Sequence, residues 1–283
     1  MATIAGEAHG GSPAALAWRR EQLFAGLYLL ATLNAFTGHA VRTIEQRGLA
    51  GAAFELFGVS AILWAALAAG LAILCRVEGA PLRAWDRPIA ILVACAALVP
   101  TAPASSVALT LLAGWGIATA LPRSALRRAS IIFLAITGAL LWGRLLLAMF
   151  SRPLLDIDAF FSAFLLDAHH QGNMLWKDGT PLKLVVAPGC SSMQGISLAL
   201  VFWATVNQYF DVRFGWRAAG YALAAVAATV AINVLRIGAM LRWPHLLDAI
   251  HHGWGWHIAM WTTLLSVVAI CVFGARREIF RAA

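Results

Sequence analysis

The residues of this chain best suited to chemistry are a cysteine, an arginine and a histidine that lie far apart in the sequence. Cys190 follows Pro188-Gly189 and precedes Ser191-Ser192, a combination typical of a helix start. At a helix start, free backbone N–H groups and the helix dipole favour the ionised thiolate. Cys190 is therefore a candidate nucleophile for acyl transfer.

His251 and Arg236 are the side chains predicted to assist a Cys190 thiolate. A thiolate that attacks a carbonyl carbon needs a general acid or base and a donor for the developing oxyanion. Arg236 lies inside an apolar run, where a charge is costly and is expected to be paired or functional. Two alternatives stay open: Arg236 extends to the membrane surface, and His251 has no catalytic role.

Three other histidines, His245, His252 and His257, lie close to His251 in the sequence. Their spacing does not match a zinc motif such as His-Glu-x-x-His, and no carboxylate pattern accompanies them. The sequence therefore predicts neither a metal nor another cofactor. His252 and His257 remain alternatives to His251 as the acid or base.

The composition indicates that lipid surrounds most of the elements that must position these residues. Of the 283 residues, 61% are hydrophobic and 12% are charged, against roughly 25% charged in an ordinary soluble domain. Basic residues produce a net charge of +8, but they are scattered between apolar runs. The lipid bilayer is therefore a predicted partner, whereas nucleic acid is not.

A span needs roughly 20 apolar residues, so the chain has room for about eight spans. We therefore predict an all-α polytopic membrane protein with a single membrane domain over residues 1–283. Pro100-Thr101-Ala102-Pro103 separates the third and fourth runs, which could instead form a re-entrant pair. The apolar runs cover residues 23–41, 56–75, 87–101, 104–121, 129–150, 193–210, 217–241 and 255–274.

The domain divides into five N-terminal spans (residues 1–150), an extramembrane segment (151–189) and a three-span core (190–275). Most Lys and Arg residues fall in loops on one side, which predicts that both termini are cytoplasmic. Residues 151–189, and the ends of the last three spans that carry Cys190, Arg236 and His251, then face the exterior.

The extramembrane segment is expected to contain a helix and a hairpin. Residues 154–165 are apolar at helical spacing, which predicts either an interfacial helix or a lid over the helix ends. Residues 173–176 and 182–186 form two short apolar runs joined through Lys177-Asp178-Gly179-Thr180, a hairpin signal.

Two polar residues inside spans have several possible partners. Arg144 could pair with Asp156 or Asp158, or approach the site. Asn233 lies three residues before Arg236, so both share one helical face. Asn233 could orient Arg236 or bond to a neighbouring helix.

Three short segments resemble the exosortase and archaeosortase family. These are Pro188-Gly-Cys190-Ser-Ser-Met-Gln-Gly, Asn233-Val-Leu-Arg236-Ile and His251-His-Gly-Trp-Gly255-Trp256. They correspond to the Cys-Ser-Gly-type, Asn-x-x-Arg and His-x-x-x-Gly motifs of that family, in the same order. The resemblance is specific between about residues 170 and 260.

The resemblance implies a membrane cysteine protease or transpeptidase at the outer face of the inner membrane. Its substrates would be exported proteins that end in a short motif such as Pro-Glu-Pro, a transmembrane helix and a basic tail. It implies that Cys190 is the nucleophile, His251 the acid or base, and Arg236 the stabiliser of the thiolate or oxyanion.

Two other classes of protein remain alternatives. One is a non-enzymatic membrane component or transporter for surface polysaccharide or protein export, for which the break at residues 100–103 is the only hint. The other is an intramembrane protease that only hydrolyses its substrate. A Cys190→Ala chain that still matures its substrate would eliminate both cysteine-based classes, and the products of a working enzyme would separate hydrolysis from transfer.

Overall fold

The computed structural model describes residues 19–179 and 182–282. The predicted cytoplasmic N-terminal end, residues 1–18, lies outside the described residues. So do residues 180–181, which include Thr180 of the predicted hairpin connection, and Ala283.

The prediction of an all-α protein with a small hairpin insertion is confirmed, and each predicted apolar run largely coincides with helical structure. Residues 56–60 of the second run are an exception, because a short 3₁₀ turn, η1 (Leu56–Gly58), precedes its helix. The helices of the runs are α1 (Arg20–Phe54), α2 (Ala61–Cys75), α3 (Asp86–Leu98), α4 (Ala102–Thr119), α5 (Ala125–Thr137), α6 (Gly143–Met149), α8 (Met193–Tyr209), α9 (Trp216–Arg242) and α11 (Trp254–Ala282). A π-helical turn, η2 (Gly138–Trp142), joins α5 to α6, so these three form one continuous helical rod.

Five helical segments among the described residues are long and apolar enough to cross a membrane: residues 20–54, 102–119, 125–149, 216–242 and 254–281. Helix α3 has 13 residues, which at 1.5 Å per residue is about 20 Å, shorter than the roughly 30 Å hydrocarbon core. Helix α2 has 15 residues and α8 has 17. The break at Pro100–Pro103 ends α3, and α4 follows with a proline in its first turn.

Helices α1 to α5 pack around a continuous apolar core. At its centre the rings of Tyr28 and Phe133 stack with their centroids 4.0 Å apart. Gly70 permits this packing, because a Cβ there would lie 2.7 Å from the Phe133 ring. Val201 of α8 belongs to the same core, so α8 links the N-terminal helices to the C-terminal ones.

A buried ion pair joins the start of α1 to the start of α3. Arg20 Nε lies 2.8 Å from Asp86 Oδ2, and Trp115 Nε1 donates a hydrogen bond to Asp86 Oδ1. Arg20 also donates to the Thr119 hydroxyl. The sequence places Arg20 in a solvent-facing loop. In the structure Arg20 is only 3% exposed, because α3 and α4 cover it.

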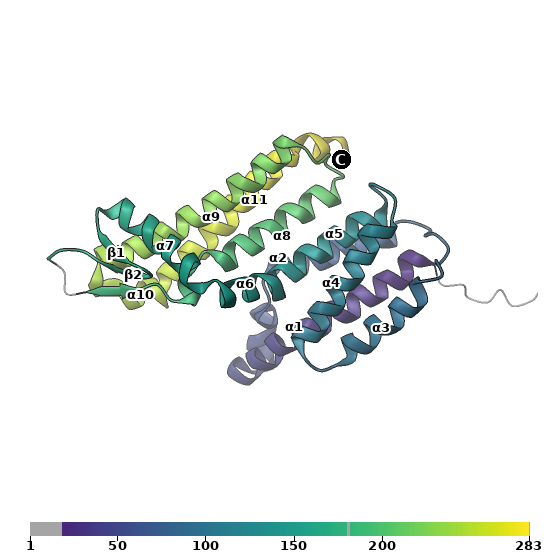
Figure 1. Ribbon diagram of the computed structural model, residues 1–283, viewed down its shortest axis with the longest axis horizontal. Helices are drawn as coiled ribbons and strands as arrows, with labels where there is room; N and C mark the ends of the chain where they lie inside the picture. Colours follow the sequence, from purple (N-terminus) through teal and green to yellow (C-terminus); the bar gives the residue numbers. More distant parts are fainter. Residues whose placement is uncertain (1–18, 180–181, 283) are drawn as a thin grey trace, which may run out of the picture.

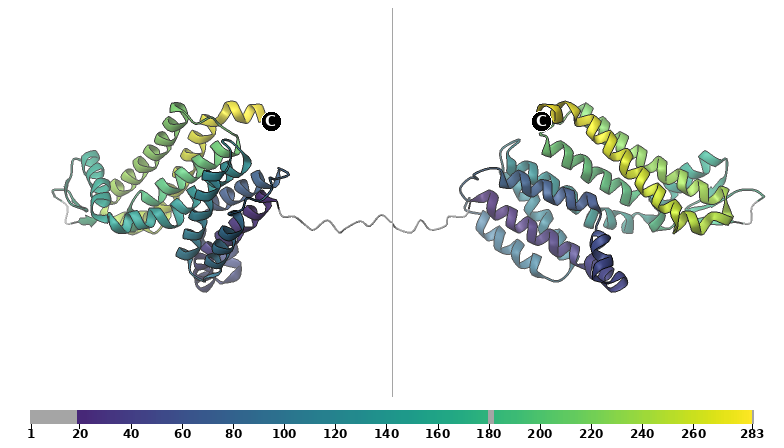
Figure 2. Two further views of the ribbon diagram at one scale, coloured as in Figure 1. Left: turned by 45° about the vertical axis from the view of Figure 1, so that its right-hand side comes forward. Right: turned by 180° about the vertical axis from the view of Figure 1, so that it is seen from behind.

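Helices α9 and α11 lie side by side, and α8 packs against both (Figure 1). In Figure 2 the view from behind shows α11 running along α9. One end of this pair carries the small sheet with α7 (Ser151–Leu166) and α10 (Leu247–His251), and the C-terminus lies at the other end. A 3₁₀ turn, η4 (Pro244–Leu246), connects α9 to α10.

The predicted hairpin is present as strands β2 (Met174–Trp176) and β3 (Lys183–Val185), which pair with Leu175 opposite Leu184. A third strand, β1 (His169–Gln171), pairs with β2 and was not predicted from sequence. It follows α7 without a separate apolar run, because two of its three residues are histidines. The sheet carries the chain to the turn that contains Cys190.

Helix α7 covers the predicted residues 154–165 and has two different faces. Leu155, Asp158, Ala159, Ser162 and Ala163 are buried, at the spacing of one helical face. The opposite face exposes a run of large apolar side chains, of which Phe164 is 80% exposed. This exposed face consists of Ile157, Phe160, Phe161, Phe164 and Leu165.

Candidate active site

Cys190 is the last residue of a 3₁₀ turn, η3 (Pro188–Cys190), that leads into α8. Its backbone N–H donates to the carbonyl oxygen of Ala187 at 2.8 Å. The residue is 6% exposed and packs in an apolar cluster with Leu175 of the sheet and Ile237 of α9. The thiol is therefore held in a defined position within an apolar environment.

His251 is the last residue of the short helix α10, and its side chain contacts the Cys190 thiol. Its Nε2 lies 2.9 Å from Cys190 Sγ, although the two residues are 61 positions apart. This distance allows direct proton transfer between the thiol and the imidazole. The structure thus brings together two of the three predicted site residues.

Gly255 accounts for the fixed spacing between His251 and the start of α11. A Cβ at Gly255 would lie 2.6 Å from the Cα of Ile250, the residue before His251. Only glycine lets α11 approach α10 this closely. The glycine of the His-x-x-x-Gly motif therefore positions the histidine by packing.

His252 holds the other nitrogen of the His251 ring. Its Nε2 lies 2.7 Å from His251 Nδ1, with the two rings perpendicular. If the Cys190 thiol donates to His251 Nε2, then Nδ1 carries the ring proton and donates it to His252. His252 thus occupies the place of the orienting group in a nucleophile–base–orienter arrangement.

His257 does not share this position. Its ring packs edge-on against Trp256, with centroids 5.0 Å apart. Of the three adjacent candidates, His251 is the one that contacts the thiol. The described residues contain no group of three or more His, Cys, Asp or Glu side chains placed to hold a metal ion.

The pKa of His251 lies below its ordinary value, mainly because burial disfavours the charged ring. The neighbouring His252 and the positive charge of Arg236 lower it further, whereas Asp248 acts in the opposite direction. The imidazole therefore stays neutral to a lower pH than a free histidine. A neutral imidazole is the form that can accept the thiol proton.

Arg236 lies on α9, and its Nε is buried without a hydrogen-bond partner among the described residues. The structure provides no hydrogen bond between Arg236 and Cys190; the link is through the charge that acts on His251. A buried donor without a partner costs free energy. Arg236 therefore retains a donor for a group that approaches the site.

Asn233 is positioned differently from both predictions made for it. Its Nδ2 donates a hydrogen bond to the backbone carbonyl oxygen of Cys190 at 2.7 Å. It forms no hydrogen bond with Arg236, and its partner lies in the 3₁₀ turn before α8 rather than in a long neighbouring helix. Asn233 thus ties α9 to the cysteine turn.

Asp158 is a site residue that the sequence reasoning missed. It is 1% exposed, and its carboxylate accepts hydrogen bonds from the backbone N–H of Ser192, at 3.1 Å, and from the Ser192 hydroxyl. It therefore caps the start of α8 from a different helix. The available signal was spacing, since Asp158 lies on the same helical face as Leu155 and Ser162.

Arg144 pairs with neither of the aspartates predicted for it. Its Nη2 instead lies 2.9 Å from Nε2 of His39, a residue of α1. Asp158 is occupied by Ser192. Arg144 and His39 line a cavity of about 170 Å³ that also touches Pro188 of the cysteine turn and Gln194.

Comparison of the chain with protein-family models, with curated proteins and with solved structures finds no match. The interpretation of the site therefore depends on its own residues: a buried thiol, an imidazole in contact with it, and a second histidine on that imidazole. The similarity to the exosortase and archaeosortase family remains a prediction from three short motifs.

Proposed function

We propose that this chain is a membrane cysteine peptidase or transpeptidase that processes the C-terminal sorting signals of exported proteins. The observation that carries the proposal is the contact of 2.9 Å between Cys190 Sγ and His251 Nε2. Two residues so far apart in the sequence meet at this distance only because α9, α10 and the sheet converge on the cysteine turn. An isolated structural cysteine does not require a basic partner.

In the proposed reaction, His251 Nε2 accepts the proton of the Cys190 thiol as the sulfur attacks a substrate carbonyl carbon. A carbon–sulfur bond forms, and the carbonyl oxygen becomes an oxyanion. As the carbon–nitrogen bond breaks, the imidazolium returns its proton to the leaving amine. The resulting thioester then passes its acyl group to an amine or to water, which restores the thiol.

Arg236 is proposed to stabilise the charge that develops in this reaction. Its buried Nε has no partner among the described residues, and a preorganised donor of this kind is most effective at a transient anion. The positive charge also keeps His251 neutral before the reaction starts. His251 is then ready to accept the thiol proton.

The proposed placement in the membrane has eight spans, with five in residues 1–150 and three in a catalytic core over residues 190–275. Both termini are cytoplasmic, and the cysteine turn faces the exterior of the inner membrane. The separation of the site from the arginine-rich end of α9 and α11 supports this orientation. A substrate helix would dock laterally, with its basic tail on the cytoplasmic side.

The test is co-expression of the chain with exported proteins that end in a short motif, an apolar helix and a basic tail. Intact mass of the substrate is measured with the wild type, with Cys190→Ala and with the control Cys75→Ala, which removes an exposed free cysteine. We expect cleavage with the wild type and with the control, and a loss of at least about a thousandfold with Cys190→Ala.

The mass of the new C-terminus separates the two outcomes of the thioester. A free carboxylate indicates hydrolysis, and an added mass indicates transfer to an amine. Equal processing by Cys190→Ala would contradict the proposal and favour a non-enzymatic role.

A further inference from the structure

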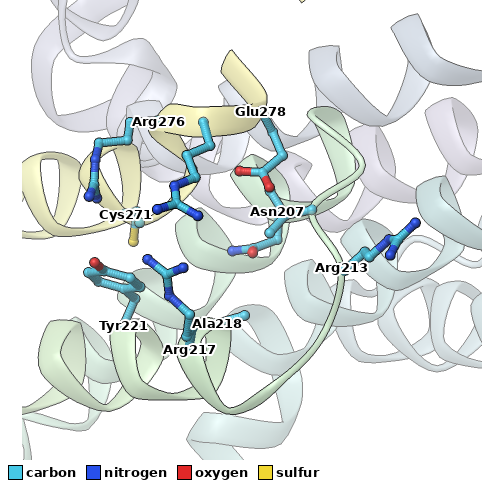
Figure 3. Close-up of a pocket in the computed structure, with 11 residues that line it drawn as sticks. Asn207, Arg213, Arg217, Ala218, Tyr221, Cys271, Arg276 and Glu278 are labelled. Atoms are coloured by element: carbon cyan, nitrogen blue, oxygen red, sulfur yellow. The ribbon is translucent and has the colours of Figure 1, made fainter. Parts of the chain in front are cut away.

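A second polar cavity lies at the end of the helix pair opposite to Cys190. It has a volume of about 120 Å³ and is formed by the end of α8, the start of α9 and the end of α11. Four arginines line it: Arg213, Arg217, Arg276 and Arg277. In Figure 3, Arg217 points into this region, beside Tyr221 and Cys271, whereas Arg213 points away at the rim.

The positive charge of this cavity is mostly uncompensated. Arg213, Arg217 and Arg277 form no hydrogen bond or ion pair with any described residue, and Glu278 is the only carboxylate that the described residues contribute to the lining. Like charges placed this close repel one another. An anion in the cavity would remove that repulsion.

Neighbouring acidic residues do not supply the missing charge. Asp211, in the turn between α8 and α9, is already paired with Arg123 at 2.7 Å and lies 4.0 Å from Arg128. Arg276 is held by its hydrogen bond to the Phe273 carbonyl and lies over the Phe273 ring. Arg217 and Arg277 are therefore available to a ligand in the cavity.

The surroundings of the cavity indicate that this ligand comes from the membrane. Trp216, beside Arg217, is 94% exposed, and Phe214, Phe273 and Phe280 are also exposed. Exposed aromatic rings next to basic residues are typical of the interface between lipid tails and headgroups. Basic pockets between spans on the cytoplasmic side bind phosphate headgroups.

We propose that the cavity binds the phosphate group of an anionic phospholipid, with its acyl chains along the exposed apolar faces of α9 and α11. Guanidinium groups bind phosphate oxygens in pairs of hydrogen bonds. The first turn of α9, which carries Arg217, adds the positive end of a 27-residue helix. Asn207 and Tyr221 supply further polar groups in the lining.

The test is native mass spectrometry of the purified full chain titrated with phosphatidylglycerol. The variant Arg217→Gln/Arg277→Gln is compared with Arg47→Gln/Arg242→Gln, which removes the same charge far from the cavity. We expect the cavity variant to bind phosphatidylglycerol roughly tenfold or more weakly, and the control to bind as the wild type does. Glu278→Gln should bind it more tightly, because the opposing carboxylate is gone.

Two further ligands identify the source of the phosphate. Phosphatidylcholine should bind weakly, and millimolar inorganic phosphate should not displace phosphatidylglycerol. Full displacement by inorganic phosphate would overturn the lipid assignment. Equal binding by the cavity variant and the wild type would overturn the site itself, and a matching melting temperature without lipid verifies that the variant is folded. Because binding is measured directly, the result is independent of the chemistry at Cys190.

Discussion

Asn233 donates its side-chain amide to the carbonyl oxygen of Cys190, with 2.7 Å between Nδ2 and O. The bond joins the middle of a long helix to the turn that carries the thiol. Arg236 lies three residues further along α9, on the same helical face. A single helix face therefore both holds the cysteine turn and presents the arginine.

Replacement of Asn233 by aspartate should weaken activity without unfolding the protein. The substitution keeps the shape but puts an acceptor against the Cys190 carbonyl oxygen. Loss of such a bond costs about 1–3 kcal/mol, which corresponds to a decrease in kcat/KM of roughly tenfold to a hundredfold. Steady-state kinetics with a cleavable substrate measures it, and Asn207→Asp, in the remote half of α8, is the control. An unchanged kcat/KM would show that the bond does not position the thiol.

His252→Ala should lower kcat by roughly tenfold to a hundredfold, because His251 loses the group that orients its Nδ1–H. His257→Ala, which removes a ring that packs on Trp256, should have little effect. The two residues are five positions apart, on either side of the start of α11. A similar loss in both would indicate general damage to the segment between α10 and α11 rather than loss of orientation.

The pH dependence of the reaction should follow the lowered pKa of His251. The acid limb of the kcat/KM profile should have its midpoint below pH 6.5, because 6.5 is the ordinary pKa of histidine and the pKa of His251 is lowered. Arg236→Gln removes a positive charge and should move this limb to higher pH, whereas Asp248→Asn should move it to lower pH. Alkylation of Cys190, followed by mass spectrometry across pH 5 to 8, measures the limb without a substrate. A shift in the same direction for both variants would contradict this assignment.

The same shift has a consequence for stability. Below pH 6.5 the unfolded chain binds a proton at His251 more readily than the native chain does. The free energy of unfolding therefore decreases as pH falls from 6.5 through the lowered pKa, and His251 has no such effect above that window.

Asp158→Ala should destabilise the fold by about 1–3 kcal/mol, because the Ser192 backbone N–H and hydroxyl lose a buried acceptor. Asp156→Ala, at a position half-exposed on the same helix, is the matched control and should change stability little. Thermal unfolding in detergent compares the two. Equal melting temperatures for both variants would mean that the cap contributes no net stability.

The helices could be predicted because lipid imposes long apolar runs and leaves their ends marked by proline, glycine and charge. The number of spans is harder, since α3 has only 13 residues and packs among longer helices. Arg20 shows the limit most clearly: a charge near the start of a run indicates a loop, yet Asp86, 66 positions away, draws it into the interior.

At the site, motif spacing indicated Cys190 and His251, because helix ends on one face meet at one level. It did not indicate Asp158, whose partner Ser192 is 34 positions away. Strand β1 was missed for a related reason: its stability comes from pairing with β2 rather than from its own composition. Contacts between distant elements decide these features, and the local pattern gives only the helical face on which Asp158 lies.

Helix α7 exposes a row of phenylalanines on one face. On its buried face, Asp158 accepts a hydrogen bond from Ser192 at the start of α8. If the aromatic row settles at a fixed height in the headgroup region, the same rigid helix sets the height of the thiol. The depth of α7 in the headgroup region then determines how far the thiol lies from the bilayer. In the proposed reaction, substrates would be cut at a constant height above the bilayer surface, and a thinner or thicker bilayer would shift the cleavage point along the substrate.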